Sequence, residues 1–321
     1  MILNFILLAA GLLGLFFGGD WLIRGASRLA RSFGISALII GLTVVSFGTS
    51  LPELIVSLNA ALLGSSDIAV GNVVGSNIAN IGLILGVAGL IYPITVRRSL
   101  LRRDMPIMLA VMVIAYLMVL DGEINRIDGG LLFLGLLAFM GLMLFIAWHE
   151  NHKPLTAAQQ AEVEAQEGPT ILKNQRGREV VRLLAGLVLL VIGARLTVDN
   201  AIEIARFIGV SELVIGITLV ALGTSLPELA ASGIAAMRHQ SDIAIGNVLG
   251  SNIFNVLSIL GVTALVKPIS VNERIIEFDG LVMIAFGLLL VPFVWNRQIS
   301  RVEAGILLVA YVAFIVATVA L

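Results

Sequence analysis

Hydrophobic residues form long stretches along the whole chain, and most polar residues gather in short segments between them. Ten of these stretches are about 17 to 25 residues long, which is the length that lets a helix cross the hydrocarbon core of a bilayer. They lie near residues 2–19, 37–63, 69–92, 104–120, 127–148, 181–204, 211–237, 244–266, 277–295 and 302–320. The pattern therefore predicts an all-α integral membrane protein with ten transmembrane helices.

The composition agrees with this prediction. Of the 321 residues, 59% are hydrophobic and 13% are charged, and the mean hydropathy is +1.04, which excludes a water-soluble domain of this size. The chain contains no cysteine, so disulfides and thiolate metal sites are excluded. The first apolar stretch lacks the basic segment and the cleavage site of a signal peptide, so we expect it to remain as a helix.

Basic residues are distributed unevenly between alternate loops. If the N-terminus lies outside the cell, the loops on the cytoplasmic side hold fifteen of the 20 lysines and arginines. The opposite loops mix a few basic residues with acids such as Asp121, Glu123 and Asp128. By the positive-inside rule, we expect a multi-pass protein of the cell membrane with both termini extracytoplasmic.

The sequence contains an internal duplication. Residues 34–93 align with residues 209–268 without a gap, at an offset of 175 residues and with 35 identities in 60 positions. Because each half then holds five spans, an odd number, the second half enters the membrane from the opposite side, as in the inverted-topology repeats of secondary transporters. We expect a first repeat at 1–148, a cytoplasmic linker at 149–179 and a second repeat at 180–321.

One motif occurs once in each repeat, inside an apolar span. Residues 48–53 read Gly-Thr-Ser-Leu-Pro-Glu, and residues 223–228 repeat the same six types. A proline within a membrane helix frees backbone carbonyls, which is tolerated only where those groups face protein, water or an ion. A carboxylate at membrane depth is costly unless it is paired or coordinated. Each copy therefore predicts a broken helix that carries a functional carboxylate, Glu53 or Glu228.

Hydroxyl groups accompany both carboxylates at helical spacing. On a continuous helix, Ser46, Ser50, Glu53 and Ser57 share one face, with Thr49 beside them. Sodium and calcium prefer oxygen ligands, and calcium takes six to eight of them, so one such stripe is insufficient. Two stripes that face each other at mid-membrane would form a shared cation site. The equivalent positions in the second repeat are Ala221, Thr224, Ser225, Glu228 and Ser232.

A Gly-Asn-x-x-Gly-Ser-Asn sequence follows each broken helix. It places Ser76 four residues before Asn80 and Ser251 four residues before Asn255, so each pair faces one side of its helix. These side chains are candidate cation ligands. Interhelical hydrogen bonding is the alternative for the two asparagines, and close helix packing is the alternative for the glycines.

At these motifs the sequence resembles the cation/calcium exchanger superfamily, and in particular its sodium/calcium exchanger branch. The resemblance covers the whole chain and implies a secondary antiporter that exchanges sodium for calcium by alternating access, without a cofactor. It implies that Glu53, Glu228, Thr49 and Thr224 ligate the metal ion. Carbonyls near Ser46 and Ala221 would help, and the implied side-chain ligands are Thr49, Ser50, Glu53, Ser76, Asn80, Thr224, Ser225, Glu228 and Ser251.

Position 255 departs from part of the family. Some members carry aspartate there, whereas this chain has Asn255, as in potassium-independent animal exchangers. Asn255 stays a candidate site residue, and we expect no potassium requirement. The proton-coupled branch has a different motif, so a calcium or other cation/proton antiporter is the alternative. A passive channel is another, although two inverted copies favour alternating access.

Other polar residues indicate no further chemistry. There is no His-Glu-x-x-His sequence and no histidine within a span, so we do not expect an enzyme. Asp67 and Asp242 precede apolar helices, and we expect them to be N-caps. The expected partners are sodium and calcium ions and the lipid bilayer, with no nucleic acid. The sequence does not indicate an oligomeric state.

Overall fold

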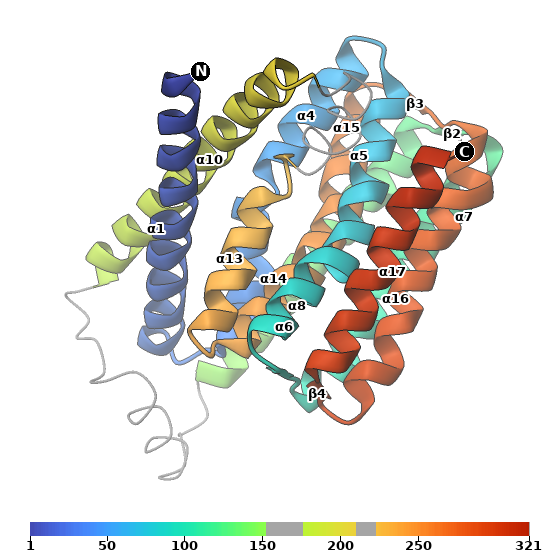
Figure 1. The fold of residues 1–321 in the computed structure, drawn as a ribbon. Coiled ribbons are helices and arrows are strands. Elements are labelled where there is room, and N and C mark those ends of the chain that lie inside the picture. The colour runs from blue at the N-terminus through green and yellow to red at the C-terminus, as the bar shows by residue number, and fades with distance from the viewer. Residues whose placement is uncertain (152–175, 210–222, 321) are drawn as a thin grey trace.

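The computed structural model describes residues 1–151, 176–209 and 223–320, and nearly all of them are helical (Figure 1). Several spans contain a π-helical segment, labelled η. The helices of the first repeat are α1 (Ile2–Ser32), α2 (Ala37–Ile40), η1 (Gly41–Val45), α3 (Ser46–Thr49), α4 (Leu51–Leu62), α5 (Ser66–Ala79), η2 (Asn80–Ile84), α6 (Leu85–Ile91), η3 (Leu100–Asp104), α7 (Met105–Met118), the 3-10 turn η4 (Val119–Asp121) and α8 (Arg126–Asn151).

The described helices of the second repeat follow the order of their counterparts in the first, without a match to η4. They are α10 (Arg176–Phe207), α13 (Leu226–Met237), α14 (Ser241–Phe254), η7 (Asn255–Leu260), α15 (Gly261–Val266), η8 (Ile275–Asp279), α16 (Gly280–Trp295) and α17 (Arg301–Ala320). Across the described residues, eight spans are long and apolar enough to cross a membrane, and the bent pair α2–α3 and α4 makes a ninth. The first half of the span expected at 211–237 lies outside the described residues, as does most of the expected linker.

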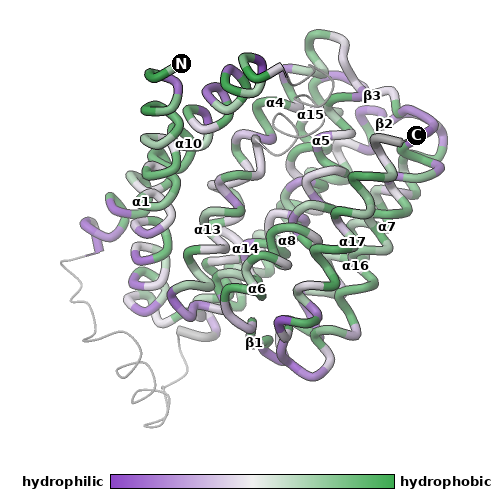
Figure 2. Tube along the Cα trace, viewed as in Figure 1, coloured by the Kyte–Doolittle hydropathy of each residue, from purple (hydrophilic) through white to green (hydrophobic). Residues whose placement is uncertain are grey.

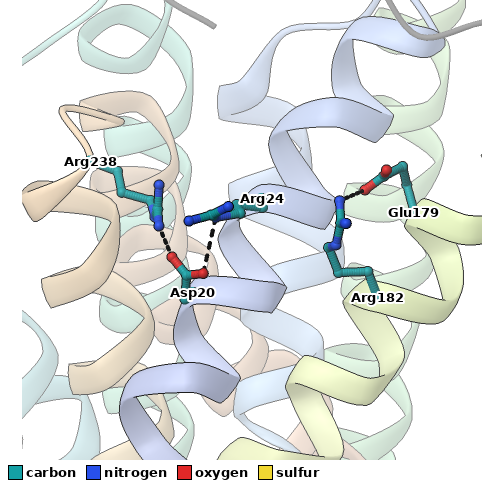
Figure 3. A network of polar contacts seen from close by, with 5 residues as sticks. All are labelled: Asp20, Arg24, Glu179, Arg182 and Arg238. Atoms are coloured by element: carbon teal, nitrogen blue, oxygen red, sulfur yellow. Dashed lines mark hydrogen bonds and ion pairs between the residues drawn. The ribbon is translucent and has the colours of Figure 1, made fainter.

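The first span extends well beyond the apolar stretch at 2–19 that the sequence indicated. α1 continues to Ser32, through residues expected in a loop, because its polar residues recur every three or four positions and share one side of the helix. Asp20 pairs with Arg24 one turn later at 3.0 Å and with Arg238 at the end of α13 (Figure 3). Charged side chains can continue a helix past the apolar core when they pair in this way.

Glycines bring α1 and α10 into backbone contact. A Cβ at Gly18 would lie 2.7 Å from the backbone nitrogen of Leu190, and a Cβ at Gly193 would lie 2.7 Å from that of Leu15. Small residues at such a crossing let membrane helices approach closely. The two helices stand together at one side of the molecule, beside α13 (Figure 1).

Two short antiparallel strand pairs join the repeats and display their symmetry. The strands are β1 (Ile94–Thr95) with β4 (Gln298–Ile299), and β2 (Glu123–Ile124) with β3 (Ile269–Ser270). Ile94 faces Ile299 in one pair and Ile124 faces Ile269 in the other, so the 175-residue offset carries each pair onto the other. The pairs lie at opposite ends of the bundle (Figure 1). This exchange of ends confirms the predicted inverted-topology repeat.

The two spans that follow the broken helices form the centre of the molecule. In the most apolar windows of Ser66–Ile91 and Ser241–Val266, 72% and 89% of the residues are buried, against 17–33% in the other continuous spans. The outer helices instead have many exposed large hydrophobic residues, and their traces are mostly hydrophobic (Figure 2). In a membrane protein the outer surface is apolar because it faces lipid, so the polar groups of the central spans are sheltered from both lipid and bulk water.

Candidate cation site

Both Gly-Thr-Ser-Leu-Pro-Glu motifs start a new helix at the residue after their serine. In the first repeat α3 ends at Thr49, α4 begins at Leu51, and the two parts are bent by 43°. Pro52 occupies the first turn of α4, where its missing N–H leaves no backbone bond unmade. α13 begins at Leu226 with Pro227 in the same position. The predicted break is therefore present in the first repeat, and the described part of the second repeat shows the matching helix start after Ser225.

The serine of each motif bonds to the other repeat instead of capping its own helix. Ser50 and Glu53 have the spacing of a capping box, yet Ser50 makes no side-chain cap. Its hydroxyl donates to Glu228 Oε1 at 3.1 Å, and the Ser225 hydroxyl donates to Glu53 Oε1 at 3.4 Å. Each glutamate is 1% exposed. The structure thus brings the two carboxylates into one buried cluster, related by the pseudo-two-fold axis.

Two asparagines that the sequence analysis did not single out organise this cluster. The Asn72 amide donates to the Glu53 carbonyl at 3.3 Å and to the Ser57 hydroxyl at 2.9 Å, while its Oδ1 accepts from Thr224 at 3.3 Å. Asn247 makes the equivalent bonds: its amide donates to the Glu228 carbonyl and the Ser232 hydroxyl, and its Oδ1 accepts from Thr49 of the first repeat. The sequence did contain a signal for these residues, because an asparagine follows the first glycine of the Gly-Asn-x-x-Gly-Ser-Asn motif in both repeats.

The hydrogen bonds of Asn72 and Asn247 also turn one serine of each repeat away from the predicted row of oxygen ligands. Ser57 is bound to Asn72 and donates to the Ala69 carbonyl at 3.3 Å, so its hydroxyl faces α5. Ser232 accepts from Asn247 at 3.0 Å in the same way. The continuous stripe expected on one helix face is wrong, because the helix breaks at Ser50.

Asn80 and Asn255 use their amide nitrogens in hydrogen bonds, while their amide oxygens have no partner among the described residues. The Asn80 amide donates to Asn252 Oδ1 at 3.0 Å, and the Asn255 amide donates to Asn77 Oδ1 at 3.1 Å. These interhelical bonds are the alternative role considered from the sequence, and they use only the nitrogen. Asn80 and Asn255 also begin the π-helical segments η2 and η7, a distortion that often marks functional positions.

Several buried oxygens of the candidate site residues have no hydrogen-bond partner among the described residues. They are Glu53 Oε2, Glu228 Oε2, Asn80 Oδ1, Asn255 Oδ1 and Ser251 Oγ. Buried polar atoms are rarely left unpaired, because each one costs about 1–3 kcal/mol. Four of these five atoms form two pairs at equivalent positions of the two repeats, so the unpartnered oxygens recur in both repeats. All five oxygens are able to coordinate a cation.

The remaining candidates take secondary positions. Thr49 donates to the Val45 carbonyl at 3.1 Å, and Ser76 accepts from Ser225 at 3.4 Å, so both line the cluster. Ser46 is fully buried and donates to the Thr43 carbonyl at 3.2 Å. Ala221 lies outside the described residues. Within the described part of the chain no three acidic or histidine side chains meet, so Glu53 and Glu228 are the acidic groups of this cluster.

The expected N-caps were wrong. α5 begins at Ser66 and α14 at Ser241, so Asp67 and Asp242 lie inside the first helical turn. An acid there is stabilised by the helix dipole without capping the helix. Asp242 in addition pairs with Arg97 at 2.5 Å.

Comparison with known proteins identifies the family. A family model described as sodium/calcium exchanger protein matches residues 3–145 and 179–320. The chain belongs to the sodium/calcium exchanger family. It is 37% identical to the sodium/calcium exchanger MaX1 of Methanosarcina acetivorans, over 98% of this chain and 97% of that protein. It is 41% identical to the inner membrane protein YrbG of Escherichia coli, over 93% and 90%.

A solved structure agrees with this assignment. The sodium-calcium exchanger NCX_Mj, soaked without sodium and calcium, superposes with a TM-score of 0.83 at 33% identity, over 98% of each chain. The ten-helix, inverted-repeat architecture is consistent with that fold, and the resemblance inferred from the motifs is confirmed. The protein is a multi-pass membrane transporter.

Proposed function

We propose that the protein lets sodium enter down its gradient and drives calcium out, through one site that is exposed alternately to the two sides of the membrane. The observation that carries this proposal is the pair of buried carboxylates, Glu53 and Glu228, each bonded by a serine of the opposite repeat. A site made equally by two inverted repeats can open toward either side by the same rearrangement.

The donor set fits a hard cation. Two carboxylates, two amide oxygens and the Ser251 hydroxyl supply five unpartnered oxygens, and the hydroxyls of Thr49 and Thr224 add to them. Calcium takes six to eight oxygen ligands, and sodium also prefers oxygen. The dinegative cluster would be balanced by one calcium ion. Transported sodium and calcium are substrates of this site, and no resident cofactor is proposed.

Uptake of calcium into reconstituted vesicles tests the exchange directly. Vesicles that contain the purified protein are loaded in turn with sodium, potassium or protons, and diluted into calcium. We expect uptake only from the sodium-loaded vesicles. Uptake driven by protons would replace the proposal with a cation/proton antiporter, and uptake without any counter-gradient would indicate a passive channel.

Exchange should need no potassium and should respond to voltage. With asparagine at positions 80 and 255, the cluster holds at most two negative charges. If three sodium ions replace one calcium, as the family resemblance implies, one net charge crosses per cycle, worth about 2.3 kcal/mol per 100 mV. In potassium-free vesicles, a potential set by a permeant anion should change the rate of sodium-driven uptake. A requirement for potassium, or a rate indifferent to the potential, would contradict this prediction.

We also propose that both termini are extracytoplasmic and that the expected linker at 149–179, whose two ends belong to α8 and α10, lies on the cytoplasmic side. The basic loops support this orientation. Because the chain has no cysteine, single-cysteine variants start from a clean background. In intact cells, an impermeant maleimide should label Glu123→Cys and should spare Asn174→Cys until the membrane is opened. The reverse pattern would invert the proposed topology.

A further inference from the structure

A groove of about 620 Å³ lies between α7 and α16, at the end of the bundle where β1 pairs with β4. Its inner wall is apolar and includes Leu109 and Val291, and Trp295 stands at its mouth, 71% exposed. Arg98, Arg102 and Arg297 form its rim. This is the end of the bundle where polar loops meet the apolar outer surface of the helices (Figure 2). The groove therefore combines a lipid-facing wall with a cationic rim.

Two arginines next to the groove form ion pairs, whereas the rim arginines form none with the residues that the structure describes. Arg97 pairs with Asp242 at 2.5 Å, and Arg103 pairs with Asp104 at 2.6 Å. In the described part of the chain no carboxylate pairs with the three rim arginines, and their side chains make no hydrogen bond. Three guanidinium groups thus line one groove, and their N–H groups are available to hydrogen-bond a ligand.

The backbone of Arg297 also adopts a left-handed conformation, which favours glycine. Its φ is +64°, in the left-handed region, and the equivalent position of the first repeat is Gly122 with φ +86°. A left-handed conformation is unfavourable for a residue other than glycine, because its Cβ crowds the following carbonyl oxygen. The second repeat therefore has an arginine at this turn despite a backbone that favours glycine, which indicates that the guanidinium has a use there.

The positions equivalent to the groove, at the other end of the bundle, carry two glutamates and a tyrosine. The 175-residue offset places Glu273 at the position of Arg98 and Glu277 at that of Arg102. Tyr116 occupies the position of Val291, and its hydroxyl donates to the Ile276 carbonyl at 2.9 Å. A Cβ on Gly280 would lie 2.9 Å from the Tyr116 ring. The open basic groove is thus not a by-product of the repeat, and a role in membrane orientation would not explain its apolar wall.

We propose that this groove binds an anionic phospholipid, whose phosphate contacts Arg98, Arg102 and Arg297 and whose acyl chain lies along Leu109 and Val291. Arginine forks match phosphate oxygens, and basic pockets between membrane helices bind acidic headgroups. Trp295 stands where tryptophan is enriched, at the level of the headgroups. A free phosphate would use the rim and not the wall. The inference is independent of the proposed transport function.

The test is lipid binding to the full-length protein in detergent, measured by native mass spectrometry with phosphatidylglycerol and phosphatidylcholine of equal chain length. We expect one phosphatidylglycerol to bind and phosphatidylcholine to bind at least about tenfold more weakly. Arg98→Gln with Arg102→Gln should weaken phosphatidylglycerol binding about 30-fold, since each arginine near a headgroup contributes about one kcal/mol or slightly less. The matched control is Arg178→Gln with Arg301→Gln, two exposed arginines outside the groove, which should change binding less than twofold.

The Val291→Tyr variant tests whether binding needs the apolar groove in addition to the positive charge of the arginines. It retains every arginine and places a ring in the groove, as Tyr116 does at the equivalent position of the first repeat, so it should abolish phosphatidylglycerol binding and leave folding intact. Unchanged binding in this variant, or an equal loss in the control pair, would overturn the proposal. Inorganic phosphate should not compete at the concentration of the lipid. Full competition by phosphate would show that the rim is an anion site that does not bind lipid.

Discussion

Glu53→Gln and Glu228→Gln should each reduce sodium-driven calcium uptake by at least about 100-fold while leaving a folded, membrane-inserted protein. Each substitution keeps the shape of the side chain and its bond to the serine of the opposite repeat. It removes one of the two negative charges that would balance a bound calcium ion. Loss of one charged partner from a buried ionic cluster costs about 3–5 kcal/mol, and 1.4 kcal/mol corresponds to a factor of ten.

The measurement is the initial rate of calcium uptake into vesicles that contain equal amounts of protein. Glu273→Gln, at an exposed carboxylate away from the cluster, makes the same chemical change and should keep the parent rate. Both site variants must fail, because the pseudo-two-fold axis gives the two glutamates equivalent positions. Near-parent exchange by either variant would show that the shared-site proposal is wrong.

Gly250→Ala should also suppress transport, through geometry instead of charge. A Cβ at this position would lie 2.5 Å from the Ser46 hydroxyl, 2.6 Å from the Leu42 carbonyl oxygen and 2.8 Å from the Leu42 Cα. Two of these three atoms are backbone, so α14 must move away from η1. That shift separates Ser251 from the broken helix of the first repeat. Overpacking of this kind typically costs about 1–3 kcal/mol of stability.

We expect uptake by Gly250→Ala to fall about tenfold or more, with a lower temperature of thermal unfolding in detergent. Gly141→Ala is the matched control, because Gly141 lies on an exposed face of α8 and a Cβ there meets no neighbour within 4 Å among the described residues. This control should keep both the rate and the unfolding temperature. Parent-like transport by Gly250→Ala would mean that the α14–η1 crossing does not set the geometry of the site.

Local features of the sequence were sufficient to predict the architecture. The membrane spans follow from hydrophobic length alone, since a bilayer sets the length of a helix that crosses it. The inverted repeat follows from an alignment offset and an odd number of spans per half. Pro52 and Pro227 predicted the helix breaks, because proline acts on its own backbone. The two buried glutamates could be identified because a carboxylate in an apolar span has no other low-cost explanation.

Contacts across the two-fold axis could not be predicted in this way. The sequence suggested that Ser50 lies on a stripe with Ser46 and Ser57, whereas the bent helix turns Ser57 toward Asn72. Asn72 and Asn247 are ordinary polar residues in sequence, and their role depends on threonines about 150 to 200 positions away.

The sequence by itself determined which membrane spans exist, how the halves are related and where charge is buried, because each of these depends on the composition of a short segment. Only the tertiary structure decided which oxygens lack a partner among the described residues, which hydroxyls bond to the other repeat, and where the basic groove lies. These features depend on the distances between segments. Hydrophobic patterning places a helix in the membrane but does not fix its bend or the neighbours that its polar groups meet.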